Sequence, residues 1–167
     1  MIYVCSLSRL HHVVETTGAR HIVTLINAET EVVRPKTIAA GDHLFLGFND
    51  IVSPAEGMTP PGAEHVEALL DFVGRWPREA PLVIHCFAGI SRSTAAAFIS
   101  ACALNPTRDE REIALALRAA SPSATPNSRL VAIADAQLGR GGRMSTAVAA
   151  IGRGRDAFEG HPFKLEL

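Results

Sequence analysis

Residues 81–102 place a strand, a cysteine-containing loop and a helix in direct succession, and this order constrains the fold more than any other feature. The run Pro81-Leu82-Val83-Ile84 is apolar and β-branched, which predicts a buried strand. The run from Ser93 to Cys102 is rich in alanine and other apolar residues, which predicts a buried helix. A glycine-containing loop between a strand and a helix N-terminus turns backbone N–H groups inward. The segment therefore predicts an anion-binding site.

The loop itself carries the residue types that phosphate chemistry needs, in the order His85-Cys86-Phe87-Ala88-Gly89-Ile90-Ser91-Arg92-Ser93. The field at a helix N-terminus favours a thiolate, so we expect Cys86 to be a nucleophile. Arg92 falls in the first turn of the helix, where its fork can bind two phosphoryl oxygens at once. Gly89 permits close approach of the backbone to an anion. A hydroxyl is expected to help the thiolate leave, and Ser93 is preferred to Ser91 for this role.

This stretch resembles the His-Cys-x5-Arg-Ser/Thr signature of cysteine-dependent protein tyrosine phosphatases, and it most resembles the dual-specificity branch, in a small bacterial-type form. The resemblance covers roughly residues 1–138 and has strong motif support only at 85–93. It implies hydrolysis of phosphomonoesters through a cysteinyl-phosphate, without metal or cofactor. It also implies that His85 braces the loop. The expected phosphate-binding residues are Phe87, Ala88, Gly89, Ile90, Ser91 and Arg92.

The reaction also needs an acid that protonates the departing oxygen. Asp50 follows a predicted strand at residues 43–48, and the resembling family places its acid on such a loop at a comparable distance from the cysteine. Asp42 is a competitor, but it precedes the strand and should lie at the wrong end of the sheet. Glu56 is a weaker alternative on the same loop. We therefore expect Asp50 to be the general acid.

The Trp76-Pro77 pair does not supply this acid. Trp76-Pro77 is reminiscent of the Trp-Pro-Asp loop of the larger tyrosine phosphatases, but Arg78 stands where the aspartate would be. Pro77 is expected to end a helix instead. The absence of a Trp-Pro-Asp loop favours the smaller dual-specificity group.

Hydrophobic periodicity assigns the rest of the chain to alternating elements. Strands are predicted at residues 2–5, 21–26 and 43–48, and helices at 8–17, 62–75, 109–120, 127–138 and 145–151. Strands that alternate with helices imply a mostly parallel sheet with helices on both faces. We therefore predict an α/β fold with a central, mostly parallel sheet in a three-layer arrangement like that of tyrosine and dual-specificity phosphatases.

The 167 residues fit one catalytic domain, placed at 1–138, and a Gly/Arg-containing extension at 139–167 that packs on it or trails it. The arginines interleaved with glycines in the extension could contact RNA or an acidic substrate. The formal net charge of −1 argues against a nucleic-acid or membrane partner. A solvated extension with a short helix is the preferred interpretation.

The three cysteines and seven histidines form no metal-ligand spacing and no disulfide framework. Cys5 and Cys102 are expected to be small core residues, although either could be a redox partner of Cys86. No apolar run is long enough to span a membrane, and the N-terminus does not resemble a signal peptide. A cytoplasmic monomer is the expectation.

Substrate class is less constrained than reaction type. The loop interior contains no lysine, which ranks phosphoinositides and inositol phosphates lower, and RNA 5′-phosphates stay open. Phosphotyrosine, alone or with phosphoserine and phosphothreonine, leads as substrate, so the expected partner is a phosphorylated protein or peptide. Two rivals from other classes are a phosphate-reading binding module and thiol-based sulfur or arsenate chemistry.

Overall fold

The computed structural model describes all 167 residues and contains one five-stranded sheet. The strands are β1 (Ile2–Ser6), β2 (His21–Ile26), β3 (His43–Gly47), β4 (Leu82–Cys86) and β5 (Phe163–Leu165). Their order across the sheet is β3-β2-β4-β1-β5. The first four strands are parallel, and β5 runs antiparallel to β1 at the edge. The carboxyl ends of β1, β2, β3 and β4 therefore meet along one side of the sheet.

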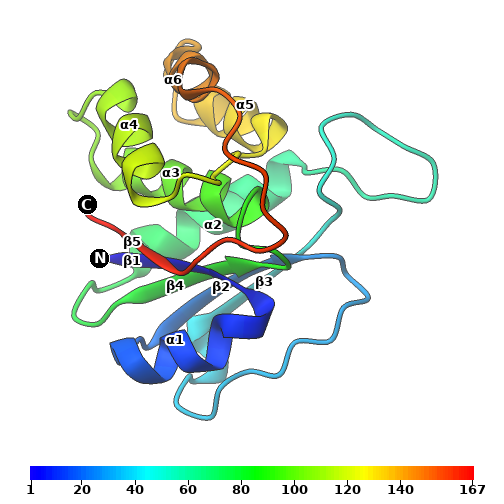
Figure 1. Ribbon diagram of the computed structural model, residues 1–167, viewed down its shortest axis with the longest axis vertical. Coiled ribbons are helices and arrows are strands. Elements are labelled where there is room, and N and C mark those ends of the chain that lie inside the picture. The colour runs from blue at the N-terminus through cyan, green and yellow to red at the C-terminus, as the bar shows by residue number, and fades with distance from the viewer.

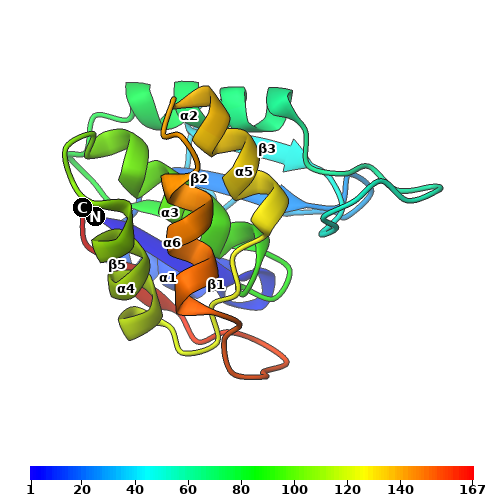
Figure 2. The same ribbon diagram turned by 90° about the horizontal axis from the view of Figure 1, so that it is seen from above.

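Six α-helices connect or follow the strands. They are α1 (Leu10–Thr17), α2 (Ala63–Arg75), α3 (Arg92–Leu104), α4 (Glu110–Ala120), α5 (Ser128–Gln137) and α6 (Arg143–Ile151). Helix α1 covers one face of the sheet, and the other five helices lie on the opposite face (Figures 1 and 2). Each face has its own apolar core, a larger one beneath α2–α6 and a smaller one beneath α1. The layers are thus helix, sheet and helices.

Helix α3 is the most completely buried helix of the fold, and its position is fixed by packing on several sides. Every residue from Arg92 to Cys102 is buried, because α3 packs on the sheet with α2, α4 and α5 around it. An alanine-rich sequence suits this position, since small side chains let neighbouring helices approach closely. The N-terminus of α3 is consequently held in a fixed place beyond the carboxyl end of β4.

The predicted α/β fold, with its mostly parallel sheet and three layers, is confirmed. The strand at 82–86 extends to the cysteine itself, and the helix predicted at 8–17 begins with a 3₁₀ turn before α1. The sequence prediction missed β5, whose three residues are too short a run to show alternation. No helix in the structure is both long and apolar enough to cross a membrane.

The extension predicted at 139–167 contributes two elements to this body. Helix α6 packs against α4 and α5, and β5 completes the sheet beside β1. The side chain of Asp135 accepts hydrogen bonds from the backbone N–H groups of Gly142 and Met144, which caps α6. Residues 152–162 connect α6 to β5 and run past the carboxyl end of β4 (Figure 1).

Candidate active site

Cys86 is the last residue of β4, and its thiol is almost completely buried at the N-terminus of α3. The backbone N–H of Gly89 donates to Sγ over 3.2 Å, and the Ser93 hydroxyl lies 3.1 Å from the same sulfur. An N–H donor, a hydroxyl and a helix N-terminus all stabilise negative charge on sulfur. The structure thus brings together the predicted nucleophile, Cys86, and the hydroxyl of Ser93 that is expected to help the thiolate leave.

The loop between Cys86 and Arg92 presents unused donors. The backbone N–H groups of Phe87, Ala88, Ile90 and Ser91 have no acceptor within the protein. Free N–H groups of this kind, next to a helix N-terminus, are suited to bind the oxygens of a phosphoryl group.

Gly89 is required by the loop's close approach to β1. It adopts a left-handed φ of 72°, and a Cβ placed there would lie 2.8 Å from the backbone of Cys5 and Ser6. Any side chain would push the loop away from the sheet. The loop is further tied to the chain that follows β1 by a bond from the Leu7 N–H to the Phe87 carbonyl, of 3.1 Å.

Arg92 is the first residue of α3 and is only 7% exposed. Its Nη1 donates to the Asn27 side-chain oxygen and to the Phe48 carbonyl, each over 2.8 Å. Its Nε is buried and has no hydrogen-bond partner. No carboxylate pairs with Arg92. One side of the guanidinium is therefore fixed by neutral groups, and the other is left to an anion from outside the chain.

Asp50 lies two residues beyond Phe48, on the loop after β3, and contacts residues 86–92, named the phosphate loop for the anion site that the sequence predicts there. Its Oδ1 accepts hydrogen bonds from the Ser91 hydroxyl and from Asn127 Nδ2, both of 2.8 Å. The carboxyl group is exposed to solvent. The structure thus brings the predicted acid to the rim of the loop that Cys86 begins.

The two alternative acids lie in different surroundings. Asp42 precedes β3 and lies 3.5 Å from His21 at the amino ends of the strands, as the sequence order predicted. Glu56 is exposed and has no side-chain hydrogen bond or ion pair. Neither carboxylate contacts the phosphate loop.

Asn127 is a site residue that the sequence analysis did not identify as such. Its side-chain oxygen caps α5 by accepting from the backbone N–H groups of Arg129 and Leu130. This leaves the amide nitrogen to donate to Asp50 and to the Ile51 carbonyl. The sequence analysis placed Asn127 only at the start of a predicted helix, because the second use of its amide depends on a loop far away in sequence.

His85 is fully buried behind the loop and belongs to a chain of hydrogen bonds across three strands. The Thr24 hydroxyl lies 2.7 Å from His85 Nε2 and 2.8 Å from His43 Nε2, while His85 Nδ1 lies 3.4 Å from the Cys86 carbonyl. One set of protons satisfies all of these contacts, with His43 donating to Thr24, Thr24 to His85 and His85 to the carbonyl. Burial lowers the pKa of His85 to about 4, so its ring is neutral near pH 7.

The other two cysteines are buried thiols of low reactivity. Burial raises the pKa of Cys5 to about 12, and it raises the pKa of Cys102 to about 12 as well. Cys5 pairs in register with His85, one residue before the nucleophile. Both are core residues, as the sequence predicted.

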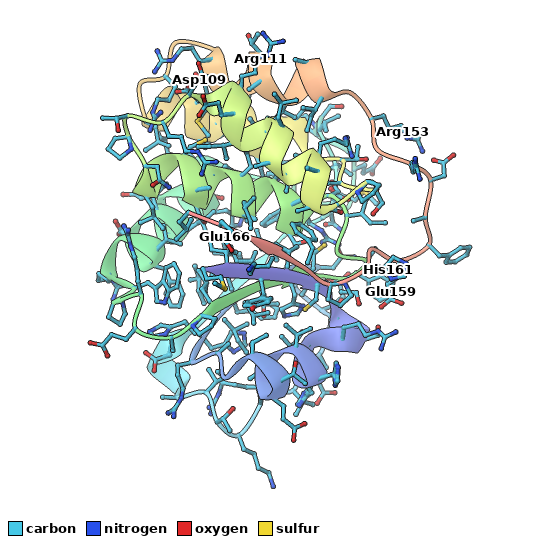
Figure 3. All side chains as sticks on the ribbon, turned by 60° about the vertical axis from the view of Figure 1, so that its left-hand side comes forward. Asp109, Arg111, Arg153, Glu159, His161 and Glu166 are labelled. Atoms are coloured by element: carbon cyan, nitrogen blue, oxygen red, sulfur yellow. The ribbon has the colours of Figure 1, made fainter.

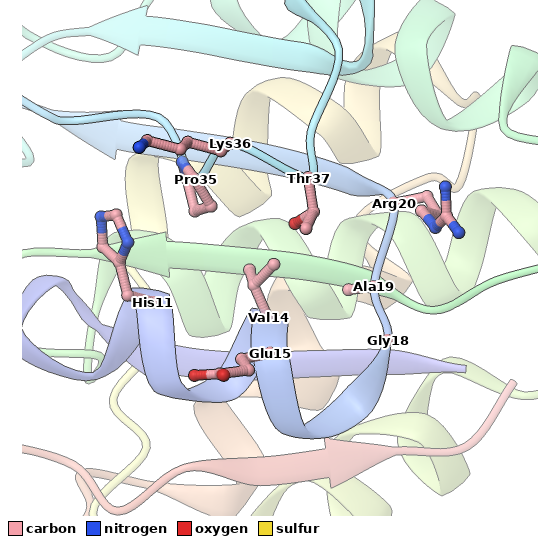
Figure 4. A pocket seen from close by; sticks show the side chains of 9 residues that line it. All are labelled: His11, Val14, Glu15, Gly18, Ala19, Arg20, Pro35, Lys36 and Thr37. Carbon is pink, nitrogen blue, oxygen red and sulfur yellow. The ribbon is translucent and has the colours of Figure 1, made fainter.

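A cavity of about 600 Å³ lies between α1 and the segment around Pro35 and shares no residue with this site (Figure 4). Its lining mixes acidic and basic side chains and contains no cysteine. No cluster of three or more histidine, cysteine, aspartate or glutamate side chains is arranged to hold a metal ion.

The fold is shared with solved phosphatase structures. The PTP-2 phosphatase of Cydia pomonella aligns over 81% of this chain and 84% of its own, with a TM-score of 0.62 and 20% identity. DUSP15 aligns over 89% and 90%, with a TM-score of 0.63 and 17% identity. The human tyrosine phosphatase-like serine/threonine/tyrosine-interacting protein aligns over 83% and 91%, with a TM-score of 0.61 and 18% identity. The fold is therefore the tyrosine and dual-specificity phosphatase fold that the resemblance implied.

At the level of sequence, no protein-family model and no curated protein matches this chain.

Proposed function

We propose that this protein is a cysteine-dependent phosphatase that hydrolyses phosphomonoesters, with phosphotyrosine in proteins as the leading substrate. The observation that carries the proposal is the buried guanidinium of Arg92, which has no carboxylate partner and a free Nε, on the loop that begins at Cys86. A buried cation without a counter-ion is costly unless an anion arrives to pair with it.

The reaction has two steps. The Cys86 thiolate attacks phosphorus, so that an S–P bond forms as the P–O bond to the leaving group breaks, and Asp50 gives its proton to the departing oxygen. Water then attacks phosphorus and passes a proton to Asp50, while the S–P bond breaks. The Ser93 hydroxyl stabilises the departing thiolate, because it already lies 3.1 Å from the sulfur.

Charge on the transferred group is stabilised by the protein itself. The Arg92 guanidinium and the free N–H groups of the loop face the equatorial oxygens in both steps. We therefore expect turnover without a divalent metal ion. Asn127 and Ser91 are positioning residues in this scheme, since both hold the same oxygen of Asp50.

Hydrolysis of p-nitrophenyl phosphate in the presence of EDTA tests the assignment. We expect Cys86→Ser to abolish turnover and Asp50→Asn to slow it by about 10²–10⁴-fold. Glu56→Gln, which changes an exposed carboxylate with no contacts on the same loop, is the matched control and should retain wild-type turnover.

A comparison of leaving groups makes the role of Asp50 specific. Phenyl phosphate releases a more basic oxygen than p-nitrophenyl phosphate, so it depends more on an acid. The loss caused by Asp50→Asn should therefore be larger for phenyl phosphate. Equal losses for the two esters would remove Asp50 from the acid role, and no turnover by the wild type would end the phosphatase proposal.

A module that binds a phosphorylated residue without hydrolysing it is the second candidate. One solved protein of the same fold is a tyrosine phosphatase-like serine/threonine/tyrosine-interacting protein. Such a module would bind a phosphopeptide equally well before and after Cys86→Ser, without turnover in either form. An enzyme would lose turnover in this variant and retain bound substrate. Sulfur or arsenate chemistry would instead appear as transfer to or from the Cys86 thiol without phosphate release.

A further inference from the structure

The segment between α6 and β5, residues 152–162, is fastened to the candidate active site and is called the strap below. The backbone N–H of Gly154 donates to the Thr125 hydroxyl over 3.1 Å. The N–H of Thr125 in turn donates to the carbonyl of Ile90, in the phosphate loop, over 2.9 Å. The start of the strap is thus linked to the end of the phosphate loop next to α3.

The end of the strap is fastened to the beginning of the same loop. The Gly160 N–H donates to the Ala88 carbonyl over 2.8 Å, and a Cβ at Gly160 would meet the neighbouring carbonyl of the loop at 2.7 Å. The carboxylate of Glu159 accepts hydrogen bonds from the hydroxyls of Ser6, the last residue of β1, and of Ser8, two residues later. Figure 3 shows Arg153, Glu159 and His161 along this side of the molecule.

These attachments place two bare phenyl rings at the edge of the phosphate loop. Phe158 of the strap is fully exposed, and Phe87, the residue after the nucleophile, is 65% exposed. Both line one groove of about 350 Å³, whose walls are Leu7, Ser8, Phe87, Ala88, Phe158 and Glu159. Four of these six side chains are hydrophobic. Exposed apolar groups gathered in a concave site are typical of a binding surface.

A second groove, of about 480 Å³, lies on the other side of the loop and includes Asp50, Asn127 and the start of the strap at Gly152 and Arg153. The strap therefore borders both grooves, and the phosphate loop lies between them. Two grooves in this arrangement can bind both sides of an extended substrate chain whose phosphate lies in the loop. A small phosphate ester would leave both grooves empty.

The charges at the two grooves favour a peptide chain over a polyanion. Glu159 lies at one groove and Asp50 at the other, while the guanidinium of Arg153 is paired with Asp156 over 2.6 Å. The carboxylate of Glu159 would repel a further phosphate of an RNA or a phosphoinositide that entered the groove beside it. An apolar side chain gains from burial against the two rings without this penalty.

We propose that the groove between Phe87 and Phe158 is a specificity subsite, which binds an apolar side chain next to the phosphorylated residue of an extended peptide substrate. This inference rests on the proposed phosphatase function and adds the class of substrate. The phosphorylated residue enters the loop at Cys86, and its apolar neighbour lies between the rings.

The test uses the full chain and alanine-based phosphotyrosine peptides that carry a single leucine at one of the four nearest flanking positions. We expect leucine at one position to raise kcat/KM by about tenfold over alanine, the range that one hydrophobic contact supplies. In Phe158→Ala this preference should fall below about twofold, with the ratio measured within the same variant. The matched control is Phe45→Ala, which removes an exposed ring on β3, outside the groove, and should keep the leucine preference.

Three results would overturn the inference. The leucine preference could be absent at every position, or it could survive in Phe158→Ala. A 5′-phosphorylated oligoribonucleotide could also exceed every peptide in kcat/KM and lose this advantage in Phe158→Ala, which would assign the groove to a nucleobase. In each of these cases the wild type still hydrolyses p-nitrophenyl phosphate. If the phosphatase proposal itself is wrong, the wild type does not hydrolyse this ester at all.

Discussion

Two arginines are buried to the same extent, 7% exposed, yet their surroundings are opposite in kind. Arg140 donates to Glu110 over 2.7 Å and to the Cys102 carbonyl over 2.8 Å, and Arg143 also contacts the same carboxylate. Arg92 has only neutral acceptors and a buried Nε without a partner. The chain thus supplies a counter-ion for one arginine and none for the other.

We infer from this difference that Arg140 is a structural cation, whereas Arg92 is available to bind an anion. A buried ion pair that keeps both partners holds α4 to the chain before α6, and removing one partner leaves an uncompensated charge. A buried guanidinium without a counter-ion instead carries a positive charge that no ion pair within the protein offsets. Its cost is offset when an anion binds, so the two sites should respond in opposite ways to substitution, acid and phosphate.

The largest effect should come from Arg92→Lys. Lysine keeps the charge but loses the planar fork that binds two phosphoryl oxygens, so turnover of p-nitrophenyl phosphate should fall by about 10³–10⁵-fold. The same exchange at Arg140 is the matched control, and below its unfolding temperature that variant should keep wild-type turnover. A loss smaller than about tenfold at Arg92 would mean that the guanidinium does not hold the transferred group.

The opposite pattern is expected for Glu110→Gln. This change leaves the buried Arg140 without its counter-ion and should lower the free energy of unfolding by about 3–5 kcal/mol, measured by urea denaturation. Glu112→Gln, an exposed carboxylate in the same first turn of α4, should change it by less than about 0.5 kcal/mol. Equal effects of the two substitutions would show that the buried pair adds no stability.

Acid should weaken the same pair. Burial alone would raise the pKa of Glu110, but hydrogen bonds from Arg143 and Arg140 outweigh it and hold the pKa at about 2, against an ordinary value of 4.5. The folded state therefore binds this proton less readily than the unfolded state. The resulting stability, about 3 kcal/mol, is present above pH 4.5 and is lost as the pH falls towards 2.

The measurement is the difference in unfolding free energy between the wild type and Glu110→Gln at a series of pH values. Subtraction removes the other carboxylates, which titrate in both proteins. The difference should shrink steadily below pH 4.5. If the difference stays constant as the pH falls towards 2, the stability lost in Glu110→Gln does not come from the charge of Glu110.

The sequence predicted the local features of the candidate active site. The strand, the loop and the helix that present Cys86 and Arg92 follow one another within 81–102, and Asp50 could be placed because it follows a strand. The resemblance added roles to these positions. All of these features depend on residues close in the chain, where apolar periodicity and turn chemistry are informative.

The partners that complete the site could not be predicted in the same way. Asn27 contacts Arg92, and Thr24 contacts His85, because β2 lies next to β4 in the sheet. The order of strands in a sheet cannot be predicted from any single segment of the sequence. The pair of Glu110 and Arg140 joins residues on different elements for the same reason. Long-range pairing is thus the part of the structure that single-residue patterns miss.

Inorganic phosphate gives the most direct separation of the two arginines, with the smallest expected effect. An anion that binds only the folded state at 100 times its Kd adds about 2.7 kcal/mol to the free energy of unfolding. This increment should be present in the wild type and in Arg140→Lys, because both retain the free Nε of Arg92, and it should vanish in Arg92→Met. Thermal unfolding with and without phosphate measures it, with chloride at equal ionic strength as the reference. An increment that persisted in Arg92→Met would place the bound anion elsewhere and would end the contrast between the two buried cations.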